Sequence, residues 1–338
     1  MKFITCENPN HLIAGTKAEP VRTPGNAILK VNRVGICGTD LHAFKGNQPF
    51  FSYPRILGHE LAATVVEADE NSQGINAGDQ VVTIPYINCG HCVACQAGKS
   101  NCCQHMQVMG VHVDGGMQEF IAVPSRLLVQ ANDLTLDEIA IVEPLAIGAH
   151  ALRRAHVKMG ETIVVMGCGP IGMGIIQLAV YIGATVVAID INNDRLEIAR
   201  KHFGADLVLN ATESPVDQLK DFTQGKLAHT VFDATGSKRA MESGADYMQH
   251  GGHLVLVGLF KGELTFHHPT LHAKETSLLC SRNATPEDFE FVMTALRAKK
   301  INSAGYITKR VTFHSIPTDF NAWASPDSNE IKIMTIWD

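Results

Sequence analysis

Hydrophobic and polar positions follow two different patterns along this chain of 338 residues. Through about residue 145, short runs rich in β-branched residues are separated by turns that contain glycine and aspartate, which predicts an irregular domain made of β-strands. The runs expected to form strands are Ala27 to Ile36, Leu61 to Ala68, Gln80 to Pro85 and Phe120 to Pro124.

From about Glu161 the pattern changes, and continuous apolar runs alternate with longer helical segments. This alternation predicts βα units around a parallel sheet. Thr285, followed by Pro286 and two acids, provides an N-cap and predicts that the last clear helix begins there. The expected strands are Thr162 to Met166, Thr185 to Ile189, Leu207 to Leu209, Thr230 to Ala234 and His253 to Val257.

The stretch from Thr162 to Ile189 contains no Asp, Glu, Lys or Arg and is long enough to span a membrane. A glycine-rich turn that includes Pro170 interrupts it between two β-branched runs. A strand, a turn, a buried helix and a second strand therefore explain the stretch better than a membrane span.

The length and the returning pattern at the end of the chain predict its domain organisation. A chain of this length most naturally forms two domains. After the helix that begins near Thr285, the sequence returns to short mixed segments. We therefore expect the second domain to be inserted in the first, with the C-terminal tail folding back.

Composition narrows the class of protein further. Hydrophobic residues make up 45% and charged residues 18% of the chain, which is typical of a globular protein with well-buried sheets. The formal net charge of −6 and a pI of about 6.2 favour neither a nucleic acid nor a membrane as a partner. The N-terminus lacks the apolar segment of a secretory signal, so we expect a cytoplasmic location, where clustered cysteines indicate metal ligands rather than disulfides.

One short stretch combines groups that bind a metal with groups that transfer a proton. It contains the thiol of Cys37, the hydroxyl of Thr39, the imidazoles of His42 and His59, and the carboxylate of Glu60. Thiolate, imidazole and carboxylate are zinc ligands, and a catalytic zinc uses three protein ligands and leaves a fourth position open. Each residue alone could be an ordinary buried side chain. Together they indicate a catalytic zinc site with an exit for a proton.

A second metal motif follows in a cysteine-rich loop. The spacing of Cys89, Cys92, Cys95 and Cys103 lets one loop surround a tetrahedral ion. Four sulfur ligands leave no position for a substrate, so this zinc would be structural. Spacing alone does not choose between Cys103 and its neighbour Cys102.

A glycine motif marks a candidate dinucleotide site. Gly167, Gly169 and Gly172, with Pro170 and Ile171 between them, follow a β-branched run and open a helical segment. This is the context that a dinucleotide-binding fingerprint requires, because the glycines allow a tight turn and let the backbone approach a pyrophosphate at the N-terminus of the helix.

Residues at the ends of later strands extend this cofactor site. Asp190 ends the second expected strand, where an acid binds ribose hydroxyls and repels a 2′-phosphate, so NAD is favoured over NADP. Arg195 nearby keeps NADP open, unless it is a solvated helix charge. Thr235, Val257 and Gly258 are expected to line the cofactor, because ligands bind at the carboxyl ends of parallel strands, although ordinary turns would also explain them.

These motifs resemble the zinc-dependent medium-chain dehydrogenases, in particular the branch that acts on sorbitol, threonine and sugar acids. The resemblance covers essentially the whole chain and rests on GICGTDLH, LGHE, CGHCVAC, VEPLAIGAH and MGCGPIGMG. The segments at 46–55, 258–264 and 281–289 are more closely similar to the group that oxidises L-galactonate or L-gulonate at C5. The resemblance implies an α/β fold.

In that fold, a GroES-like β-rich catalytic domain is split by a Rossmann domain with a doubly wound parallel sheet. The resemblance places the catalytic domain, with both zinc sites, at residues 1–147 and 288–338, and the Rossmann domain at residues 148–287. It also implies a homodimer or homotetramer that extends the Rossmann sheet.

The resemblance also implies roles for residues that spacing leaves unassigned. Glu143 would approach the catalytic zinc with Cys37 and His59, and Glu60 would be an alternate ligand or a neighbour of the ligands. Without the resemblance, Glu143 before a proline would indicate only the start of a helix. Cys103, rather than its neighbour, would bind the structural zinc, which gives two zinc ions per chain.

The same residues suggest a mechanism. A zinc ion would make a substrate hydroxyl more acidic, and NAD would accept the hydride. Thr39 is placed to accept the substrate proton, and the resemblance implies a relay through the cofactor ribose to His42 and solvent. An imidazole that titrates near neutrality suits this last step.

The sequence predicts oxidation of a secondary hydroxyl of a sugar acid to a keto acid. The substrate carboxylate needs a cation, and Arg282 is preferred over Arg55 and Lys45 because it follows the last Rossmann strand. Arg55 could equally form a structural ion pair. A neutral polyol or threonine is the alternative substrate, and a zinc-stabilised dinucleotide-binding sensor without catalysis is the alternative class.

Overall fold

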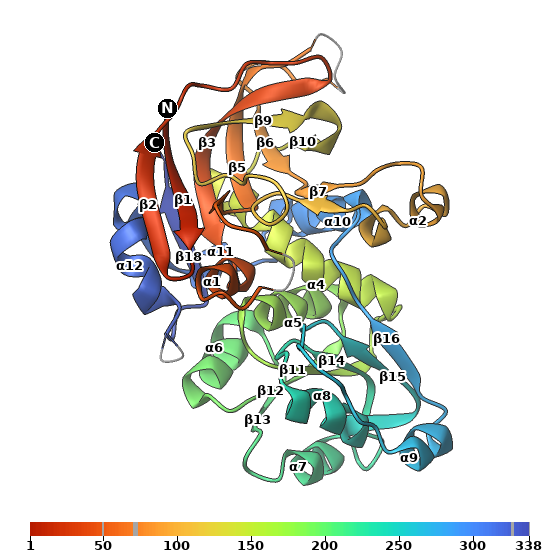
Figure 1. Cartoon of the computed structure of the whole chain (residues 1–338). Helices are drawn as coiled ribbons and strands as arrows, with labels where there is room; N and C mark the ends of the chain where they lie inside the picture. The colour runs from red at the N-terminus through yellow and green to blue at the C-terminus, as the bar shows by residue number, and fades with distance from the viewer. Residues whose placement is uncertain (49–50, 70–73, 326–327, 338) are drawn as a thin grey trace. The chain divides into compact units, whose positions relative to one another are not determined.

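The computed structural model folds into two compact units (Figure 1). Unit 1 comprises Met1–Pro144 and Ser303–Asp338, and unit 2 comprises Leu145–Asn302. The domain boundaries expected from the sequence follow residues 147 and 287, whereas the second boundary between the units follows residue 302. The residues that the structure describes are 1–48, 51–69, 74–325 and 328–337.

Unit 1 is built on a seven-stranded sheet. Its main order is β10-β6-β5-β3-β18-β17, and β9 also pairs with β3. β18 comes from the C-terminal tail and pairs antiparallel with β3, with Ile333 opposite Ile36, so the tail folds back into unit 1. The strands are β3 (Asn26–Ile36), β5 (Glu60–Glu67), β6 (Gln80–Thr83), β9 (Phe120–Pro124), β10 (Leu128–Gln130), β17 (Ile307–Thr312) and β18 (Lys332–Ile336).

Smaller elements of unit 1 surround this sheet. A three-stranded sheet has the order β2-β1-β4, and β7 pairs with β8 in a separate hairpin. The strands are β1 (Lys2–Asn8), β2 (His11–Thr16), β4 (Arg55–Ile56), β7 (Tyr86–Ile87) and β8 (Gln107–Val108). The α-helices are α1 (Gly38–Phe44), α2 (Val93–Gln96), α3 (Leu136–Ala140), α11 (Ser303–Tyr306) and α12 (Ile316–Trp323), and 3-10 turns are Ser100–Cys102, Ser125–Leu127 and Phe313–Ser315.

Unit 2 contains a six-stranded sheet with the order β13-β12-β11-β14-β15-β16, and each neighbouring pair is parallel. The order in which strands are added reverses between β11 and β14, while all strands stay parallel, as in doubly wound dinucleotide-binding folds. The parallel sheet expected from the sequence is thereby confirmed. The strands are β11 (Thr162–Met166), β12 (Thr185–Asp190), β13 (Leu207–Asn210), β14 (Ala228–Asp233), β15 (Met248–Leu256) and β16 (Ser277–Cys280).

Helices connect the strands of unit 2. α10 begins after Thr285, whose side chain forms a capping box with Asp288, as the N-cap signal predicts. The uncharged stretch from Thr162 to Ile189 forms β11, α5 and β12, and no described helix is long and apolar enough to cross a membrane. The helices are α4 (Val142–Arg154), whose first three residues belong to unit 1, α5 (Pro170–Ile182), α6 (Asn193–Phe203), α7 (Pro215–Phe222), α8 (Lys238–Ser243), α9 (His268–Ala273), α10 (Pro286–Arg297) and a 3-10 turn at Gly244–Tyr247.

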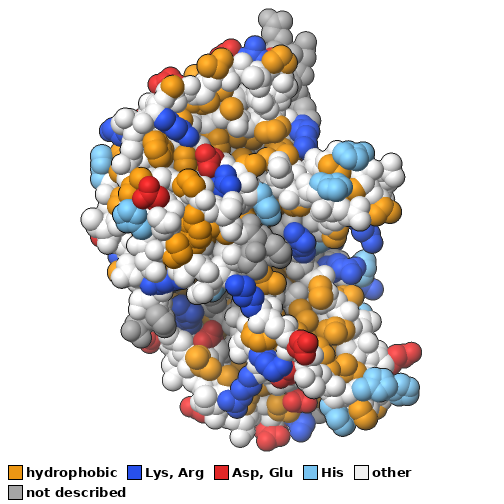
Figure 2. Space-filling view, in the orientation of Figure 1, with side chains coloured by type: hydrophobic (Ala, Val, Ile, Leu, Met, Phe, Trp, Pro, Cys, Tyr) orange, Lys and Arg blue, Asp and Glu red, His pale blue; other side chains and the backbone are white. Residues whose placement is uncertain are grey.

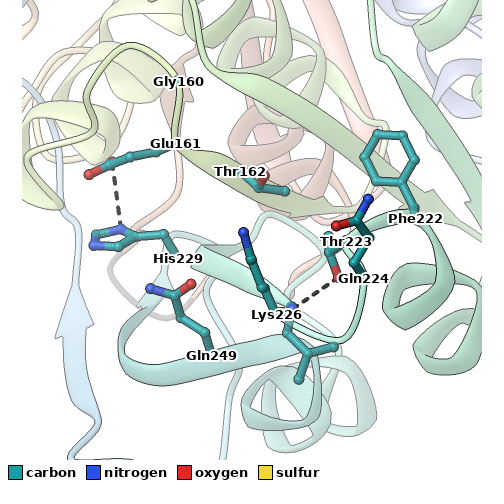
Figure 3. A pocket seen from close by; sticks show the side chains of 10 residues that line it. Gly160, Glu161, Thr162, Phe222, Thr223, Gln224, Lys226, His229 and Gln249 are labelled. Atoms are coloured by element: carbon teal, nitrogen blue, oxygen red, sulfur yellow. Dashed lines mark hydrogen bonds and ion pairs between the residues drawn. The ribbon is translucent and has the colours of Figure 1, made fainter.

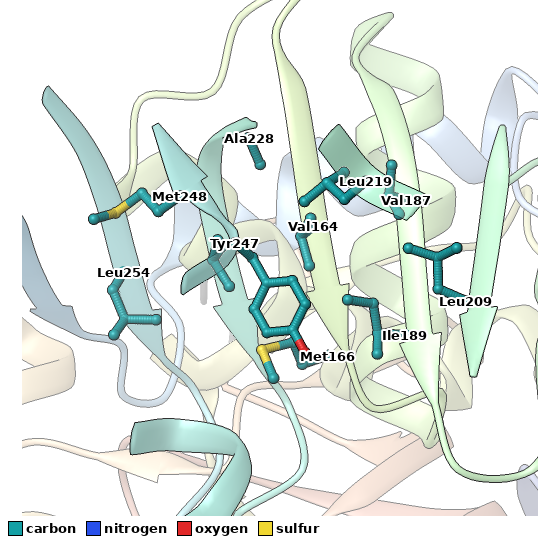
Figure 4. Packing of buried hydrophobic residues seen from close by; sticks show 11 residues of the cluster. Val164, Met166, Val187, Ile189, Leu209, Leu219, Ala228, Tyr247, Met248 and Leu254 are labelled. Atoms are coloured by element: carbon teal, nitrogen blue, oxygen red, sulfur yellow. The ribbon is translucent and has the colours of Figure 1, made fainter. Parts of the chain in front are cut away.

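A buried hydrophobic cluster holds this sheet to the helix and turn that cover it (Figure 4). Val164, Val187 and Leu209 come from three neighbouring strands, Leu219 comes from α7, and Tyr247 comes from the 3-10 turn. Burying apolar side chains stabilises a domain by roughly 25 cal/mol per Å² of apolar surface, so this cluster fixes the strands whose ends carry the glycine motif.

Candidate metal and cofactor sites

Cys37 lies at the N-cap of α1, directly after β3. Its sulfur accepts a hydrogen bond from the backbone N–H of Thr39 at 3.5 Å, and the Asp40 side chain accepts one from the backbone N–H of Cys37 at 2.9 Å. This pair of contacts is a capping box in which a thiol takes the place of the usual hydroxyl. The local sequence therefore fixes the direction of the Cys37 sulfur.

Asp40 joins the segment that carries Cys37 to the segment that carries His59. One carboxylate oxygen accepts from Cys37, and the other accepts from the backbone N–H of Gly58 at 3.0 Å and lies 3.8 Å from His59 Nδ1. Burial raises the pKa of Asp40, while the charge on His59 and the two backbone donors act to lower it. Asp40 stands inside the motif GICGTDLH, yet residue spacing gave it no role.

Three candidate ligands come together in unit 1. The donor atoms of Cys37, His59 and Glu60 lie within 4.8 Å of one another. Glu60 is also bound by Lys332, whose Nζ lies 2.6 and 2.7 Å from its two oxygens and donates to the Ile36 carbonyl at 3.0 Å. Both side chains are buried. Lys332 was not predicted from the sequence, although a lysine beside the apolar residues of β18 is a signal of a buried partner.

Gly35 makes room for the Glu60 side chain. The two residues are opposite each other in the register of β3 and β5. A Cβ atom built at Gly35 would come within 2.1 Å of a Glu60 carboxylate oxygen, which is far closer than real carbon atoms approach. Any larger residue at this position would displace the carboxylate from the metal donors.

Glu143 approaches the same site from the first turn of α4. It is buried, and its Oε1 accepts a hydrogen bond from the hydroxyl of Tyr86. Burial raises the pKa of the Glu143 carboxyl to about 7, against the lowering effect of the charge on His59. Burial and the Glu143 charge also raise the pKa of Tyr86, so the tyrosine is the donor. Glu143 is not in the group of three donors that lie within 4.8 Å of one another.

This donor set fits a zinc ion. Lys332 balances one of the two buried carboxylates, and a cation would balance the charge of Glu143. The Nδ1 atom of His59 is buried without a hydrogen-bond partner among the described residues, and the Asp40 oxygen lies 3.8 Å from it. Thiolate, imidazole and carboxylate together are a ligand set typical of catalytic zinc.

A second group of metal donors lies in the loop between β7 and β8. The sulfur atoms of Cys89, Cys92, Cys95 and Cys103 lie within 4.8 Å of one another, whereas Cys102 is exposed and outside the group. Backbone N–H groups donate to these sulfurs at 3.3 to 3.5 Å. Such donors lower the pKa of Cys92 to about 6, which favours its thiolate, whereas burial outweighs them at Cys103 and raises its pKa to about 11. The set fits a closed, four-coordinate structural zinc.

The expected proton-transfer residues lie on α1. Thr39 is partly buried, and His42 is exposed. Such a difference in exposure is what a proton path from a buried site to solvent needs.

The three cations considered for a substrate carboxylate have different surroundings. The Lys45 ammonium donates to the Asn321 side chain at 2.7 Å, and Arg55 pairs with Asp114 at 3.3 Å. Arg282 is exposed in the segment between β16 and α10. Within the predicted substrate segment at 46–55, residues 49 and 50 (Pro49 and Phe50) lie outside the described residues.

The glycine motif of unit 2 forms a cradle between β11 and α5. Gly169 is the N-cap of α5, Pro170 is its first residue, and Ile171 follows. A Cβ atom at Gly172 would lie 1.8 Å from the carbonyl oxygen of Gly167, so only glycine permits this approach of helix and strand. The cradle leaves backbone N–H groups at the helix N-terminus, which fits a pyrophosphate.

Asp190 lies at the carboxyl end of β12 and supports this cradle. It accepts hydrogen bonds from the backbone N–H groups of Cys168 at 2.6 Å and Asn192 at 2.9 Å. A carboxylate oxygen has two acceptor sites, so Asp190 can still accept from a ribose hydroxyl. Arg195 lies in the first turn of the next helix, α6.

Thr235, Val257 and Gly258 gather around Asp233 at the carboxyl ends of β14 and β15. The Asp233 carboxylate accepts from the Thr235 hydroxyl at 2.5 Å, and its backbone carbonyl accepts from Val257 and Gly258 at 2.9 and 3.0 Å. Asp233 is buried, and residue spacing did not identify it. Asp233 thus holds the expected cofactor-lining residues together, Thr235 through its carboxylate and the other two through its backbone carbonyl.

A separate hollow lies at the amino ends of the same strands (Figure 3). Its volume is about 400 Å³, and its lining includes Thr162, Lys226 and Gln249. Glu161 and His229 lie next to each other at one side of it, with 3.6 Å between Oε2 and Nδ1. Because parallel sheets bind dinucleotides at the carboxyl ends of their strands, this hollow is not the cofactor site.

A β-rich domain with two groups of metal donors, joined to a Rossmann domain with a glycine cradle, defines a metal-dependent oxidoreductase. Residues 23–133 match the family model described as the alcohol dehydrogenase GroES-like domain, and residues 170–298 match the one described as zinc-binding dehydrogenase. On the face shown in Figure 2, basic, acidic and apolar side chains are interspersed, as expected from the modest net charge.

The chain is 42% identical to L-galactonate-5-dehydrogenase from Escherichia coli, over 94% of this chain and 93% of that protein. It is 30% identical to sorbitol dehydrogenase from Halalkalibacterium halodurans, over 98% of each. The solved structure of RspB from Escherichia coli, in complex with NADH, has a TM-score of 0.92 at 27% identity and covers 99% of both chains. The chain therefore belongs to the zinc-binding medium-chain dehydrogenase family, and it is an enzyme that acts on CH–OH groups.

Proposed function

We propose that this enzyme oxidises a secondary hydroxyl of a sugar acid, a hexonate such as L-galactonate or L-gulonate at C5, with NAD as the hydride acceptor. The observation that carries the substrate class is the 42% identity to L-galactonate-5-dehydrogenase over nearly the whole chain. Identity to a sorbitol dehydrogenase supports a neutral polyol as the second candidate.

Unit 1 supplies the metal site and the proton path. Cys37 and His59 would hold the zinc, with Glu143 or Glu60 as the third ligand. When bound, zinc supplies the positive charge that acidifies a substrate hydroxyl, and NAD supplies the hydride acceptor. Thr39 would then accept the hydroxyl proton. The exposed His42 imidazole would release it to solvent.

The four-cysteine group would hold a structural zinc, with Cys89, Cys92, Cys95 and Cys103 as its ligands. Because four thiolates complete a tetrahedral shell, no substrate oxygen can enter this site. This zinc would stabilise the folded loop between β7 and β8, because a metal that binds only the folded state stabilises that state.

Unit 2 supplies the cofactor site. Gly167, Gly169 and Gly172 would allow the pyrophosphate to approach the N-terminus of α5, and Asp190 would bind the ribose hydroxyls. The carboxylate of Asp190 disfavours a 2′-phosphate, so we assign NAD rather than NADP, with Arg195 as the residue that could weaken this preference.

Arg282 is the proposed partner of the substrate carboxylate. A guanidinium can bind a carboxylate through two parallel hydrogen bonds, and an exposed position in the segment after β16 leaves Arg282 accessible to substrate. Of the other two candidates, Lys45 contacts Asn321 and Arg55 pairs with Asp114.

The purified enzyme should be assayed with NAD and with NADP on hexonates, sorbitol and threonine, by the absorbance of the reduced nicotinamide. We expect the highest kcat/KM on a hexonate with NAD, and loss of turnover after a chelator removes the catalytic zinc. Arg282→Ala should raise KM for the hexonate about tenfold or more and leave KM for sorbitol within twofold, since it removes one charged hydrogen-bonded pair.

Each arm has an outcome that contradicts it. No turnover on any hexonate would overturn the substrate class, and turnover untouched by complete zinc removal would overturn the mechanism. Equal effects of Arg282→Ala on sugar acid and polyol would remove Arg282 from the substrate site.

A further inference from the structure

Tyr86 is a buried tyrosine that the chemistry above does not use. Its hydroxyl donates to Glu143 Oε1, and both side chains are almost completely enclosed, with 6% and 4% exposed. The charges of Cys37 and Glu60 also act on this hydroxyl. Tyr86 therefore lies among the candidate catalytic ligands, although it belongs to a different element, β7.

The position of Tyr86 is set by the base of the four-cysteine loop. Tyr86 begins β7 and lies opposite Val108 of β8 in an antiparallel pair, and the Met109 backbone N–H donates to the Pro85 carbonyl at 3.1 Å. All four cysteines lie between these two strands. A metal held by the cysteines therefore closes the loop whose two ends form the hairpin.

Contacts continue from this hairpin to the sulfur atoms. Asn88, two residues after Tyr86, donates from its side chain to Cys95 Sγ at 3.6 Å, and Arg126 donates to the Asn88 side chain and carbonyl at 2.8 and 3.1 Å. A hairpin with two residues in each strand is marginally stable by itself. Its geometry depends on these contacts and on closure of the loop.

We propose that Tyr86 is a positioning residue that holds the Glu143 carboxylate at the catalytic metal site, and that the four-cysteine group acts on catalysis by keeping Tyr86 in place. The hydroxyl satisfies one acceptor site of a buried carboxylate and thereby fixes its direction. This inference rests on the proposed function only in assigning the catalytic metal to the Cys37 and His59 site, and it does not depend on the substrate.

Tyr86→Phe removes one oxygen and keeps the ring. Loss of such an outer partner typically costs 10–100-fold in metal affinity or activity. We therefore expect the catalytic site to bind its metal about tenfold or more weakly and kcat to fall by a similar factor, with KM for NAD unchanged. With cobalt in the catalytic site and zinc in the cysteine group, the visible absorption bands should also shift, since they report the ligands of cobalt.

Tyr247→Phe is the matched control. Tyr247 is equally buried, but it lies in the hydrophobic cluster of unit 2 (Figure 4). We expect no change in the cobalt bands and less than a twofold change in kcat. If Tyr86→Phe lowers only the melting temperature and leaves cobalt bands and metal affinity as in the parent, Tyr86 is merely structural and the inference is wrong.

The second arm tests the link to the cysteines. Cys95→Ser should weaken metal binding at the catalytic site as Tyr86→Phe does, and the double variant should be no worse than Cys95→Ser alone, because both act on one contact. Additive effects would show that the cysteine group does not act through Tyr86. Asn88→Ala, which cuts the contact between the hairpin and Cys95, replaces Cys95→Ser if that variant does not fold. Metal affinity is measured without substrate, so a wrong hexonate assignment would leave this result unaffected.

Discussion

At the scale of residues, Glu60 and Glu143, two of the buried carboxylates near Cys37 and His59, have partners of different chemistry. Glu60 is held by the charge of Lys332, and Glu143 is held by the neutral hydroxyl of Tyr86. Spacing within one stretch predicted that Cys37, His59 and Glu60 would meet. It could not predict the two partners, because Lys332 is distant in sequence and reaches Glu60 only when β18 pairs with β3.

Lys332→Met should destabilise the metal-free protein much more than the zinc-loaded one. Removing one member of a buried ion pair leaves the other charge unpaired and costs about 3–5 kcal/mol. A bound zinc would supply part of the missing positive charge to Glu60. We therefore expect the urea midpoint to fall strongly without zinc and less with zinc, as measured by circular dichroism.

The control for this prediction removes both charges. Lys332→Met combined with Glu60→Gln should be more stable without metal than Lys332→Met alone, because no unpaired charge remains. If the two single effects simply add, or if zinc makes no difference to the loss, the ion pair is not coupled to the metal site.

At the scale of elements, prediction from the sequence succeeded where one local signal sufficed. β11 has the expected bounds because an unbroken β-branched run ends at a glycine, and α10 begins at its N-cap. β1 and β2 were missed, because their sequences, KFITCEN and HLIAGT, do not alternate strictly between apolar and polar residues. β15 begins at Met248, earlier than expected. Its first half contains Gly251 and Gly252, and glycines in a run argue against a strand in a prediction from sequence.

α10 belongs to unit 2, whereas the domain boundary predicted from the sequence, after residue 287, falls within this helix. A contact between α4 and α10 explains the difference. Asp288 accepts from Arg153 Nε at 2.7 Å and is paired with His150 at 2.8 Å, and it also caps its own helix through Thr285. Burial alone would raise the pKa of Asp288, but these hydrogen bonds hold it well below its usual range. The network therefore stabilises the folded state while Asp288 is ionised.

Because the pKa of Asp288 is lower in the folded state than the value of about 3.9 in the unfolded chain, its contribution is complete above that value and is lost as the pH falls further. Asp288→Asn should thus lower the melting temperature at pH 7 and reduce its fall between pH 5 and pH 3, as measured by calorimetry. Asp217→Asn, at an exposed helix pair with Lys220, should change neither appreciably. Parallel curves for the parent and Asp288→Asn would contradict this account.

At the scale of the whole molecule, the order of the strands places β16 at one edge of the six-stranded sheet. Its burial alternates, and Leu278 and Cys280 are exposed. An exposed edge strand offers unpaired backbone groups and, here, an apolar side chain to another chain. These features support the homo-oligomer implied by the family resemblance, in which two copies of the sheet would join edge to edge.

Leu278→Lys should therefore lower the oligomeric state. A lysine at the centre of a symmetric strand pair would bring two like charges together and remove apolar contact, and charged edge residues are a known means of blocking such pairing. We expect the parent to show the mass of a dimer or tetramer by light scattering after size exclusion, and the variant to show a smaller assembly. Leu259→Lys is the control, because it adds the same charge at an exposed leucine after β15. We expect it to keep the parent's mass. If both variants keep the parent's mass, or if the parent is a monomer, β16 is not the assembly edge.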